Sequence, residues 1–543
     1  MSRFFVGIDV GTGSARAGLF DENGNLKASA KRAITIWHEA GNIVEQSSEQ
    51  IWQAVCESAR EAVSAAGIPP SAVAGIGFDA TCSLVVVAPD GAPVAAGPSG
   101  DAQRNVIVWM DHRAAGEASE INSGAHEVLR YVGGRISPEM ETPKLLWLKR
   151  NLPGSFAGAG HFFDLADYLS WRATGSLARS ACTVTCKWTY LAHEKRWDAQ
   201  YFRAIGVEEL ADEGFKRIGT DIVDPGTPLA NGLTEKAAVD LGLPAGIAVG
   251  AGLIDAHAGG IGTLGGRDAR GSTDVRNRLA YIFGTSACSM VSSNDPVFVD
   301  GVWGPYHSSM VPGLWLTEGG QSAAGAALDH LATMHPASGE ARVKAEAAGL
   351  SLVAWLDREV TRLCPDLSRS VELAGSIHVV PEFMGNRSPH ADPDARAIIA
   401  GLGLDADIRS LISLYVAGLC GIGYGLRQLL EKLSQNGIVP DTIVASGGAA
   451  QSNLVRQVLA DTTNLPVAIA DSEEPVLLGA AMLGAVAAGR YQSLTEAMGV
   501  MSRLSKQYDP QGGATRELHT HRYLAFGLLQ AAGRQIRPVI PKS

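Results

Sequence analysis

Residues 4–20 read FFVGIDVGTGSARAGLF, which is an apolar run, a turn of small residues and a second apolar run. This pattern predicts two strands joined by a tight hairpin turn, because Gly permits close backbone approach and φ > 0. Residues 280–290, AYIFGTSACSM, have the same design. Exposed N–H groups and Ser or Thr hydroxyls at such turns bind anionic oxygen. We therefore predict two hairpins, one in each half of the chain, that close on the phosphates of one nucleotide.

An acid, Asp9, lies next to the first turn. A phosphate-bound Mg²⁺ ion takes oxygen ligands, and carboxylates supply them in proteins. Asp9 is therefore our candidate metal ligand.

Composition and charge narrow the class of protein. The chain has 543 residues, a formal net charge of −11 and no long basic run, so nucleic-acid binding is disfavoured. Seven cysteines spread over this length do not predict a disulfide framework. The N-terminus is not a signal peptide, and the apolar stretches near 244–266 and 475–488 do not predict membrane spans. We expect a soluble cytoplasmic protein, for which a homodimer is one conceivable assembly.

The order of the predicted elements indicates an α/β fold in two units. In the first half, a helix over 47–67 and a buried strand over AVAGIGFDA follow the hairpin, and CSLVVVAPDGAPV predicts a second hairpin that turns at Asp90-Gly91. In the second half, a long helix, strand, helix, strand and helix follow one another up to PVLLGAAMLGAVAAG. We place the first domain at 1–265, with GGRDARGSTDVRNR as connector. The second domain covers 266–505, and 506–543 is an extension that packs on it.

Two glycine motifs are excluded or weak. The sequence has no Gly-Lys pair, which excludes a P-loop of the Walker type. Gly260, Gly262 and Gly265 match the spacing G-x-G-x-x-G, but no strand-like segment directly precedes them. We interpret them as packing glycines of a helix.

Two further segments carry candidate chemistry. SGGAA at 446–450 follows a predicted strand and precedes a helix, where α/β sheets bind ligands, so it could receive adenosine with Asn453 nearby. Asp255 lies among apolar and small residues in GLIDAHAG, where an isolated carboxylate is costly unless it is paired, metal-bound or functional. A helix-capping Asp is the alternative. We expect His257 to be a structural hydrogen-bonder.

The set DVGTGSAR, WMDHRA, METPKLLWLKRN, GLIDAHAG, FGTS, SGGAAQSNLVRQVLAD and LGAAMLGA resembles the FGGY family of carbohydrate kinases, in order from residue 4 to about 490. The resemblance implies two ribonuclease-H-like α/β domains, of the ATPase core shared with actin, Hsp70 and hexokinase, with a cleft between them. It also implies transfer of phosphate from MgATP to a sugar. It suggests Asp255 as the base that faces the sugar hydroxyl, and Asp9 near Mg²⁺, usually through water. The ATP contacts that it implies, with Asn453 added by position, are Gly11, Thr12, Gly13, Ser14, Gly284, Thr285, Ser286, Gly447, Gly448, Ala449 and Asn453.

The sugar is harder to predict. The segment DATCSLVV lacks the Arg-Glu pair by which a sequence resembles glycerol kinases. It also lacks the Met-His pair by which a sequence resembles xylulose kinases. TCSLVV and GLIDAHAG resemble the D-ribulokinase group, so D-ribulose is the expected substrate. L-ribulose, D-xylulose, erythritol and glycerol stay as alternatives, and a non-catalytic nucleotide sensor is the rival class. The candidate sugar contacts, besides Asp255, are Asp79, Thr81, Cys82, Ser83, Asp111 and Arg113. For Asp111 and Arg113, a structural ion pair is an equal alternative.

Overall fold

The first hairpin forms as the sequence predicts. The computed structural model describes residues 3–267 and 271–537. Strands β1 (Phe4–Gly11) and β2 (Ser14–Asp21) pair antiparallel, with Thr12 and Gly13 as the turn between them. Both faces of β1 are buried, which explains why its apolar run does not alternate with polar residues.

The first sheet combines this hairpin with parallel strands. β1 pairs in parallel with β6, and β6 pairs in parallel with β12. Helix α1 (Ser48–Ala65) covers one face, and its N-cap is Ser47, whose hydroxyl accepts from the N–H of Gln50. The order across the sheet is β12 (Ala248–Ile254), β6 (Val73–Ala80), β1, β2 and β3 (Leu26–Ala33).

The second sheet repeats the design of the first. β13 and β14 form the second predicted hairpin, β16 extends it antiparallel, and β19 and β20 continue it in parallel. Three antiparallel strands followed by two parallel ones is the order of the first sheet as well, and two edge strands are added here. The order is β15 (Trp303–His307), β16 (Trp315–Gln321), β14 (Ala287–Ser293), β13 (Arg278–Phe283), β19 (Thr442–Ser446), β20 (Val467–Ala470) and β21 (Leu504–Tyr508).

A third, antiparallel sheet lies beside the first. The predicted turn at Asp90-Gly91 exists, and Gly91 has φ +86°. Its return segment forms only a bridge at Pro93, however, so a second strand of that hairpin was wrongly predicted. Strand β7 pairs with β8 and β9 instead. The order is β4 (Trp37–Glu39), β5 (Ile43–Gln46), β8 (Val106–Ile107), β7 (Leu84–Val87) and β9 (His161–Asp164).

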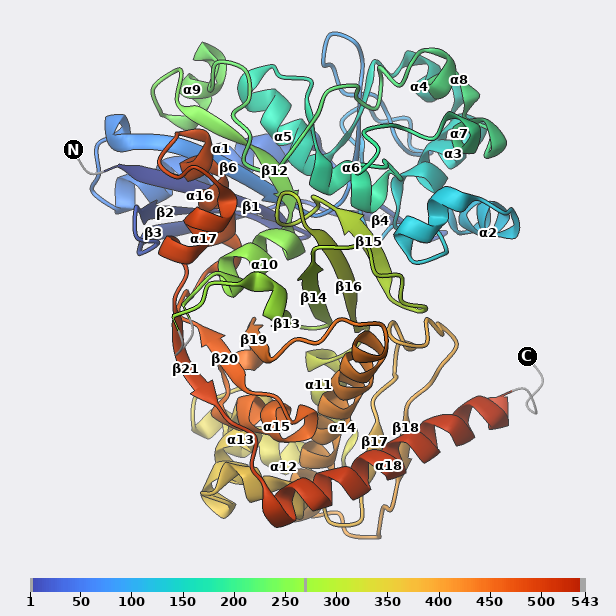
Figure 1. Cartoon of the computed structure of the whole chain (residues 1–543), viewed down its shortest axis with the longest axis vertical. Helices are drawn as coiled ribbons and strands as arrows, with labels where there is room; N and C mark the ends of the chain where they lie inside the picture. Colours follow the sequence, from blue (N-terminus) through green and yellow to red (C-terminus); the bar gives the residue numbers. More distant parts are fainter. Residues whose placement is uncertain (1–2, 268–270, 538–543) are drawn as a thin grey trace.

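Helix α16 (Pro475–Ala487) belongs to the first sheet, although we expected it to complete the second unit. It lies on β1, β6 and β12, as Figure 1 shows for the red helix among the blue strands. A Cβ atom on Gly7 would lie 1.9 Å from the Leu477 carbonyl oxygen, and one on Gly77 would lie 1.9 Å from that of Ala480. Helix and strand backbones touch here, and only glycine permits that approach.

The segment 244–265 forms β12 and then α10 (Asp255–Leu264) without a loop. Residues 255–259 lie between the end of the strand and Gly260 and are helical, so no strand directly precedes the G-x-G-x-x-G match. The three glycines lie within or at the end of α10, and a Cβ atom on Gly262 would be 1.9 Å from the Pro475 carbonyl oxygen. They are packing positions, as interpreted. Residues 268–270 of the expected connector lie outside the described residues.

Helix α14 (Ile408–Gln435) is long and apolar enough to cross a membrane, but most of its apolar window is buried in the second core. The long helix α18 (Gly513–Ile536) packs against α14, α15 and β17 at the bottom of Figure 1. The other helices are α2 (Ala115–Ser123), α3 (Glu141–Asn151), α4 (Pro153–Gly158), α5 (Leu165–Thr174), α6 (Ala181–Lys187), α7 (Ala199–Ala204), α8 (Glu208–Asp212), α9 (Glu235–Leu241), α11 (Gly325–Met334), α12 (Ser338–Ala347), α13 (Leu352–Leu363), α15 (Asn453–Thr463) and α17 (Leu494–Met501). The two-stranded sheets are β10 (Arg179–Ser180) with β11 (Ile222–Val223), and β17 (His378–Val380) with β18 (Ile398–Ala400).

Candidate active site

Three acids lie at the carboxyl ends of three neighbouring parallel strands. Asp9 on β1 is opposite Asp79 on β6, and Asp255 follows the last residue of β12. Side chains alternate along a strand, so Asp9 shares the face of Gly7, and Asp79 the face of Gly77. That face is the one that contacts α16. Distant acids of the sequence thus meet at one sheet edge.

Asp255 has the environment of a general base. It is the first residue of α10, and its Oδ1 accepts from the N–H of Ala256 at 2.7 Å. Burial, and next the charge of Asp9, raises its pKa to about 6. A carboxylate with this pKa is mostly ionised near pH 7 and is still basic enough to accept a proton.

Asp79 is fully buried and Asp9 is only 2% exposed, but the Arg16 ion pair is made with Asp9. Burial, and next the carboxylate of Asp9, raises its pKa well above the ordinary value. Two carboxyl groups this close do not both ionise, so Asp79 is the one that keeps its proton.

Asp9 makes an ion pair with a cation. Arg16 Nη2 lies 2.6 Å from Asp9 Oδ2, and Arg16 Nη1 donates to Glu474 at 2.7 Å. Within residues 3–267 and 271–537, no cluster of three or more His, Cys, Asp and Glu side chains could hold a metal by itself. Mg²⁺ that arrives with nucleotide phosphates needs only one or two carboxylates and keeps several waters. Asp9 fits such a water-mediated role.

The two predicted turns leave space for phosphate in different ways. A Cβ atom on Gly13 would have no neighbour within 4 Å, so the outer side of this turn is open. The backbone of Gly284 and Thr285 contacts the start of α11 through the N–H groups of Ala324 and Gly325. Positive φ was wrongly expected at these turns, because Gly11, Gly13 and Gly284 all lack it. The two-residue turn of the first hairpin and the three-residue turn of the second hairpin therefore close without positive φ at these glycines, a backbone geometry that other residues also adopt.

A cavity of about 810 Å³ lies between the second sheet and the first hairpin. Gly447 and Gly448, two of the predicted adenosine contacts, line it. Gly447 has φ +92°, and a Cβ atom there would lie 2.5 Å from the Phe283 carbonyl oxygen, so this position suits glycine. Ala449 and Asn453 are not among its lining residues, and the Asn453 side chain accepts from the Tyr508 hydroxyl instead. Sequence reasoning missed other lining residues, among them Arg16, Gln451, Arg456 and Glu474.

The candidate sugar contacts after β6 are mostly committed to the protein. Ser83 is fully buried, and its Oγ accepts from the N–H of Trp109 at 3.1 Å and lies 3.1 Å from Thr81 Oγ1. Cys82 keeps 8% of its surface exposed, and burial raises its pKa to about 12, so it is a neutral thiol. The geometry therefore favours a structural role for Ser83.

Asp111 and Arg113 form a closed structural network. Asp111 is fully buried, accepts from the N–H of Val44 at 2.6 Å and pairs with Arg113 at 2.7 Å. The same guanidinium binds Glu45 at 2.9 Å and the Ala96 carbonyl oxygen at 2.7 Å. These contacts use most donors of Arg113, so the structural alternative is favoured over sugar contact.

A charged cluster near Asp255 was missed by sequence reasoning. Lys187 lies at the end of α6, and its positive charge favours the ionised form of three carboxyl groups. It acts to lower the pKa of Asp255, of Glu318 on β16 and of Glu139. Two cations lie near the ring of Trp303. Lys187 Nζ is 5.7 Å from the ring centre, and the guanidinium of Arg387 is 5.4 Å from the same ring centre. The sequence feature that marked Asp255, a single charged residue in an apolar run, could have identified two of these residues as well. Lys187 stands alone in TCKWTYL, and Glu318 stands alone in LWLTEGG.

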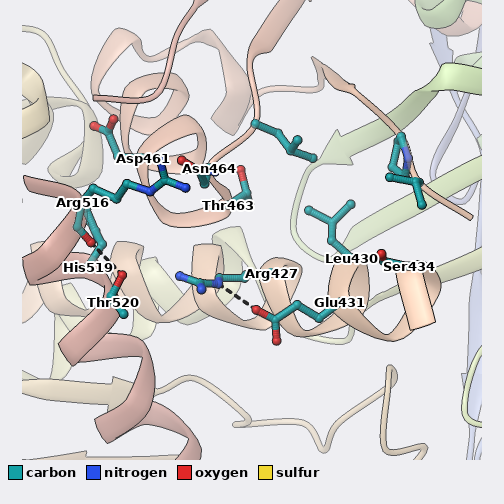
Figure 2. Close-up of a pocket in the computed structure, with 13 residues that line it drawn as sticks. Arg427, Leu430, Glu431, Ser434, Asp461, Thr463, Asn464, Arg516, His519 and Thr520 are labelled. Atoms are coloured by element: carbon teal, nitrogen blue, oxygen red, sulfur yellow. Dashed lines mark hydrogen bonds and ion pairs between the residues drawn. The ribbon is translucent and has the colours of Figure 1, made fainter. Parts of the chain in front are cut away.

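Figure 2 shows another pocket, of about 320 Å³, between α14, α15 and α18. None of the predicted site residues lines it. Arg427 on its floor already donates to Glu431 at 2.9 Å. The three acids and both hairpins lie elsewhere, so this pocket is not the candidate active site.

Comparison with known proteins places this geometry in a family. The models of the N-terminal and C-terminal domains of the FGGY family of carbohydrate kinases match residues 4–262 and 279–488. The chain belongs to the FGGY family of carbohydrate kinases. This FGGY kinase is 46% identical over 520 residues to the human "FGGY carbohydrate kinase domain-containing protein", covering 94% of this chain and 93% of the relative. It is 39% identical over 534 residues to a D-ribulokinase of Saccharomyces cerevisiae, covering 93% of this chain and 75% of that protein.

Solved structures share the fold of this FGGY kinase. A xylulose kinase from Rhodospirillum rubrum matches with a TM-score of 0.79 and 22% identity, covering 98% of this chain and 99% of that one. A gluconate kinase from Lactobacillus acidophilus matches with a TM-score of 0.79 and 21% identity, covering 98% of each chain. The predicted two-domain α/β fold and the predicted enzyme class, an ATP-dependent sugar kinase, are confirmed.

Proposed function

We propose that this FGGY kinase phosphorylates the terminal hydroxyl of a ketopentose, with D-ribulose as its best substrate and D-ribulose 5-phosphate as its product. The observation that carries the proposal is 39% identity, over 93% of the chain, with a protein named D-ribulokinase. The segment DATCSLVV, which lacks the Arg-Glu and Met-His pairs, supports it.

In the proposed reaction, Asp255 accepts the proton of the sugar hydroxyl, and that oxygen attacks the γ-phosphorus in line. The bond from the γ-phosphorus to the bridging oxygen breaks, and ADP leaves. The open turn at Gly13 and the turn at Gly284 would hold the phosphates through backbone N–H groups, which absorb charge as it develops. The chain itself performs little covalent chemistry. Positioning of the two substrates and electrostatic stabilisation supply most of the acceleration.

The two substrates would divide between the two domains. ATP would occupy the 810 Å³ cavity beside Gly447 and Gly448, mostly on the domain that we place at 266–505. The sugar would lie near Asp255 and Cys82, mostly on the domain at 1–265. The charged side chains of Lys187 and Glu318 suit hydroxyl recognition there, because the charge of Lys187 acts on Asp255 and that of Glu318 acts on Lys187. Closure of the domains would exclude water and limit hydrolysis of ATP.

Mg²⁺ bound to the ATP phosphates would neutralise their charge. Asp9 is the residue that would hold it, through water, at the edge of the first hairpin. The ion pair with Arg16 holds the Asp9 carboxylate at this edge.

A substrate panel tests the proposal. ADP release is measured with MgATP and D-ribulose, L-ribulose, D-xylulose, glycerol or erythritol. D-Ribulose should give the highest kcat/KM, by roughly 10²-fold or more over an epimer that leaves buried polar groups unpaired. Faster use of D-xylulose or glycerol would overturn the assignment. A cytoplasmic location and a homodimer remain predictions, to be checked by localisation of the tagged protein and by light scattering.

A further inference from the structure

A chain of three buried side chains joins the two halves of the molecule directly behind Asp255. His257, two residues along α10, has only 1% of its surface exposed. Its Nδ1 lies 3.0 Å from Cys182 Sγ on α6, and its Nε2 lies 3.4 Å from Glu318 Oε2 on β16 of the second sheet. The expected structural hydrogen-bonder therefore connects the helix that carries Asp255 with a strand of the other domain.

The hydrogen positions follow from the partners. Burial acts to raise the pKa of Glu318, but the hydrogen bond and charge of His257, with the charges of Lys187 and Arg387, together lower it. Glu318 is therefore an acceptor, and His257 Nε2 must carry a hydrogen. Cys182 Sγ already accepts from the N–H of Ile254 at 3.3 Å, and its thiol hydrogen can point at Nδ1. Burial acts to lower the pKa of His257, but the charge of Cys186 and the hydrogen bond to Glu318 raise it. The neutral Nε2–H ring and the imidazolium ion both carry the hydrogen that Glu318 accepts.

Glu318 has its second oxygen available. The hydrogen bond from His257 uses Oε2, and Glu318 keeps 8% of its surface exposed. Lys187 and Arg387 act on the same carboxylate from the side of the charged cluster. A carboxylate fixed at one oxygen and accessible at the other can accept a hydrogen bond from a ligand hydroxyl in a defined direction.

We propose that His257 is a positioning residue, which holds Glu318 through its Nε2–H group as the acceptor for a substrate hydroxyl and couples Glu318 to the helix that carries Asp255. The proposal rests on the proposed function, because it assumes that a sugar hydroxyl is the ligand of Glu318. His257 itself touches neither substrate. Its contribution is to sugar binding and not to ATP binding.

Three variants test this role. His257→Leu removes the donor at similar volume and should raise the KM for the sugar about 10-fold or more, with the KM for ATP changed less than about twofold. His257→Gln, whose amide N–H can replace Nε2–H, should restore the sugar KM to within about threefold of the wild type. The double variant H257L/E318Q should bind sugar no worse than Glu318→Gln alone, because His257 acts through Glu318.

A matched control is Tyr201→Phe, which removes another buried hydrogen bond, the 2.8 Å contact with Thr142, far along the first domain. It should leave both KM values unchanged. Equal increases in both KM values for His257→Leu, no rescue by His257→Gln, or additive losses in the double variant would overturn the proposal.

A measurement without sugar separates this inference from the substrate assignment. Spectra of the ¹⁵N-histidine-labelled wild-type enzyme at pH 7.5 should show a ring with hydrogen on Nε2, assigned by its loss in His257→Leu and shifted in Glu318→Gln. An Nε2 without hydrogen would overturn the inference, even if D-ribulose is the substrate. If none of the five sugars reacts while Nε2–H is present, the substrate assignment fails and the hydrogen-bonded link to Glu318 stands.

Discussion

Asp9 and Asp79 are opposite one another on β1 and β6, but Arg16 makes its ion pair with Asp9. Burial, and next the carboxylate of Asp9, raises the pKa of Asp79, so this fully buried acid keeps its proton. Asp79→Asn replaces one neutral side chain with another of the same shape. We expect a kcat within about tenfold of the wild type and an equal or higher Tm. Steady-state kinetics and thermal unfolding check this, and a loss as large as that of Asp255→Asn would show that Asp79 must ionise.

Asp255→Asn should abolish most turnover while both substrates still bind. General-base catalysis contributes roughly 10²–10⁴-fold, so kcat should fall by about 100-fold or more. Calorimetric titration should give sugar and nucleotide affinities close to those of the wild type. A variant that keeps more than about a tenth of wild-type turnover would show that Asp255 is not the base.

The same substitution should stabilise the fold near neutral pH. The pKa of Asp255 is raised to about 6, so the native state binds more protons than the unfolded state between about pH 4 and pH 6. Its contribution to stability is therefore lost as pH rises through this range. Because Asp255 is partly exposed, we expect Asp255→Asn to gain at most about 2 kcal/mol at pH 7.5 and nothing near pH 4. Denaturant unfolding at the two pH values measures the difference.

Activity should depend on the ionisation of Asp255. The kcat of the wild type should fall with an acid limb near pH 6, because the base must be ionised. The charge of Asp9 raises that pKa, so Asp9→Asn should move the limb to lower pH while it also reduces kcat. Glu61→Gln, which removes an exposed acid on α1, is the control and should leave the limb in place. A limb that moves upward in Asp9→Asn would contradict the proposed coupling.

Two glycines of the nucleotide site should respond differently to a side chain. A Cβ atom on Gly13 meets open space, so Gly13→Val should keep the Tm within about 2 °C but raise the KM for ATP, because the side chain would fill the phosphate space. Gly447 has φ +92° and a carbonyl oxygen 2.5 Å from a new Cβ, so Gly447→Ala should cost about 1–3 kcal/mol of stability. Normal ATP affinity in Gly13→Val would exclude a phosphate at this turn.

Arg113 should matter for stability and not for sugar recognition. Arg113→Met leaves the buried carboxylate of Asp111 without its cation and leaves Glu45 only its ion pair with Arg104; breaking a buried pair in this way typically costs about 3–5 kcal/mol. Where the variant is folded, its KM for sugar should stay within about twofold of the wild type. Arg32→Met, which removes only exposed ion pairs with Glu57 and Glu61, should change stability by less than about 1 kcal/mol. A selective rise of the sugar KM in Arg113→Met would restore the alternative of substrate contact.

The sequence by itself determined the elements and the chemistry that depend on neighbouring residues. Both hairpins follow from apolar runs around small turn residues, and the cap at Ser47 and the strand over 73–80 are equally local. Asp255 could be singled out because a carboxylate within an apolar run needs a reason to be there. Gly447 could be singled out because it directly follows a strand, at the edge where α/β sheets bind ligands.

Only the tertiary structure decided which distant residues share a site. The placement of α16 on the first sheet depends on backbone contact at Gly7 and Gly77, which no local pattern encodes. The cluster of Lys187, Glu318 and Arg387 comes from three separate segments, and its charges become informative only when the fold brings them together. The tertiary structure also decided the sign of φ at Gly13 and the protonated state of Asp79. Backbone geometry at a turn and the ionisation of a buried acid depend on the atoms packed around them, and those atoms come from the whole chain.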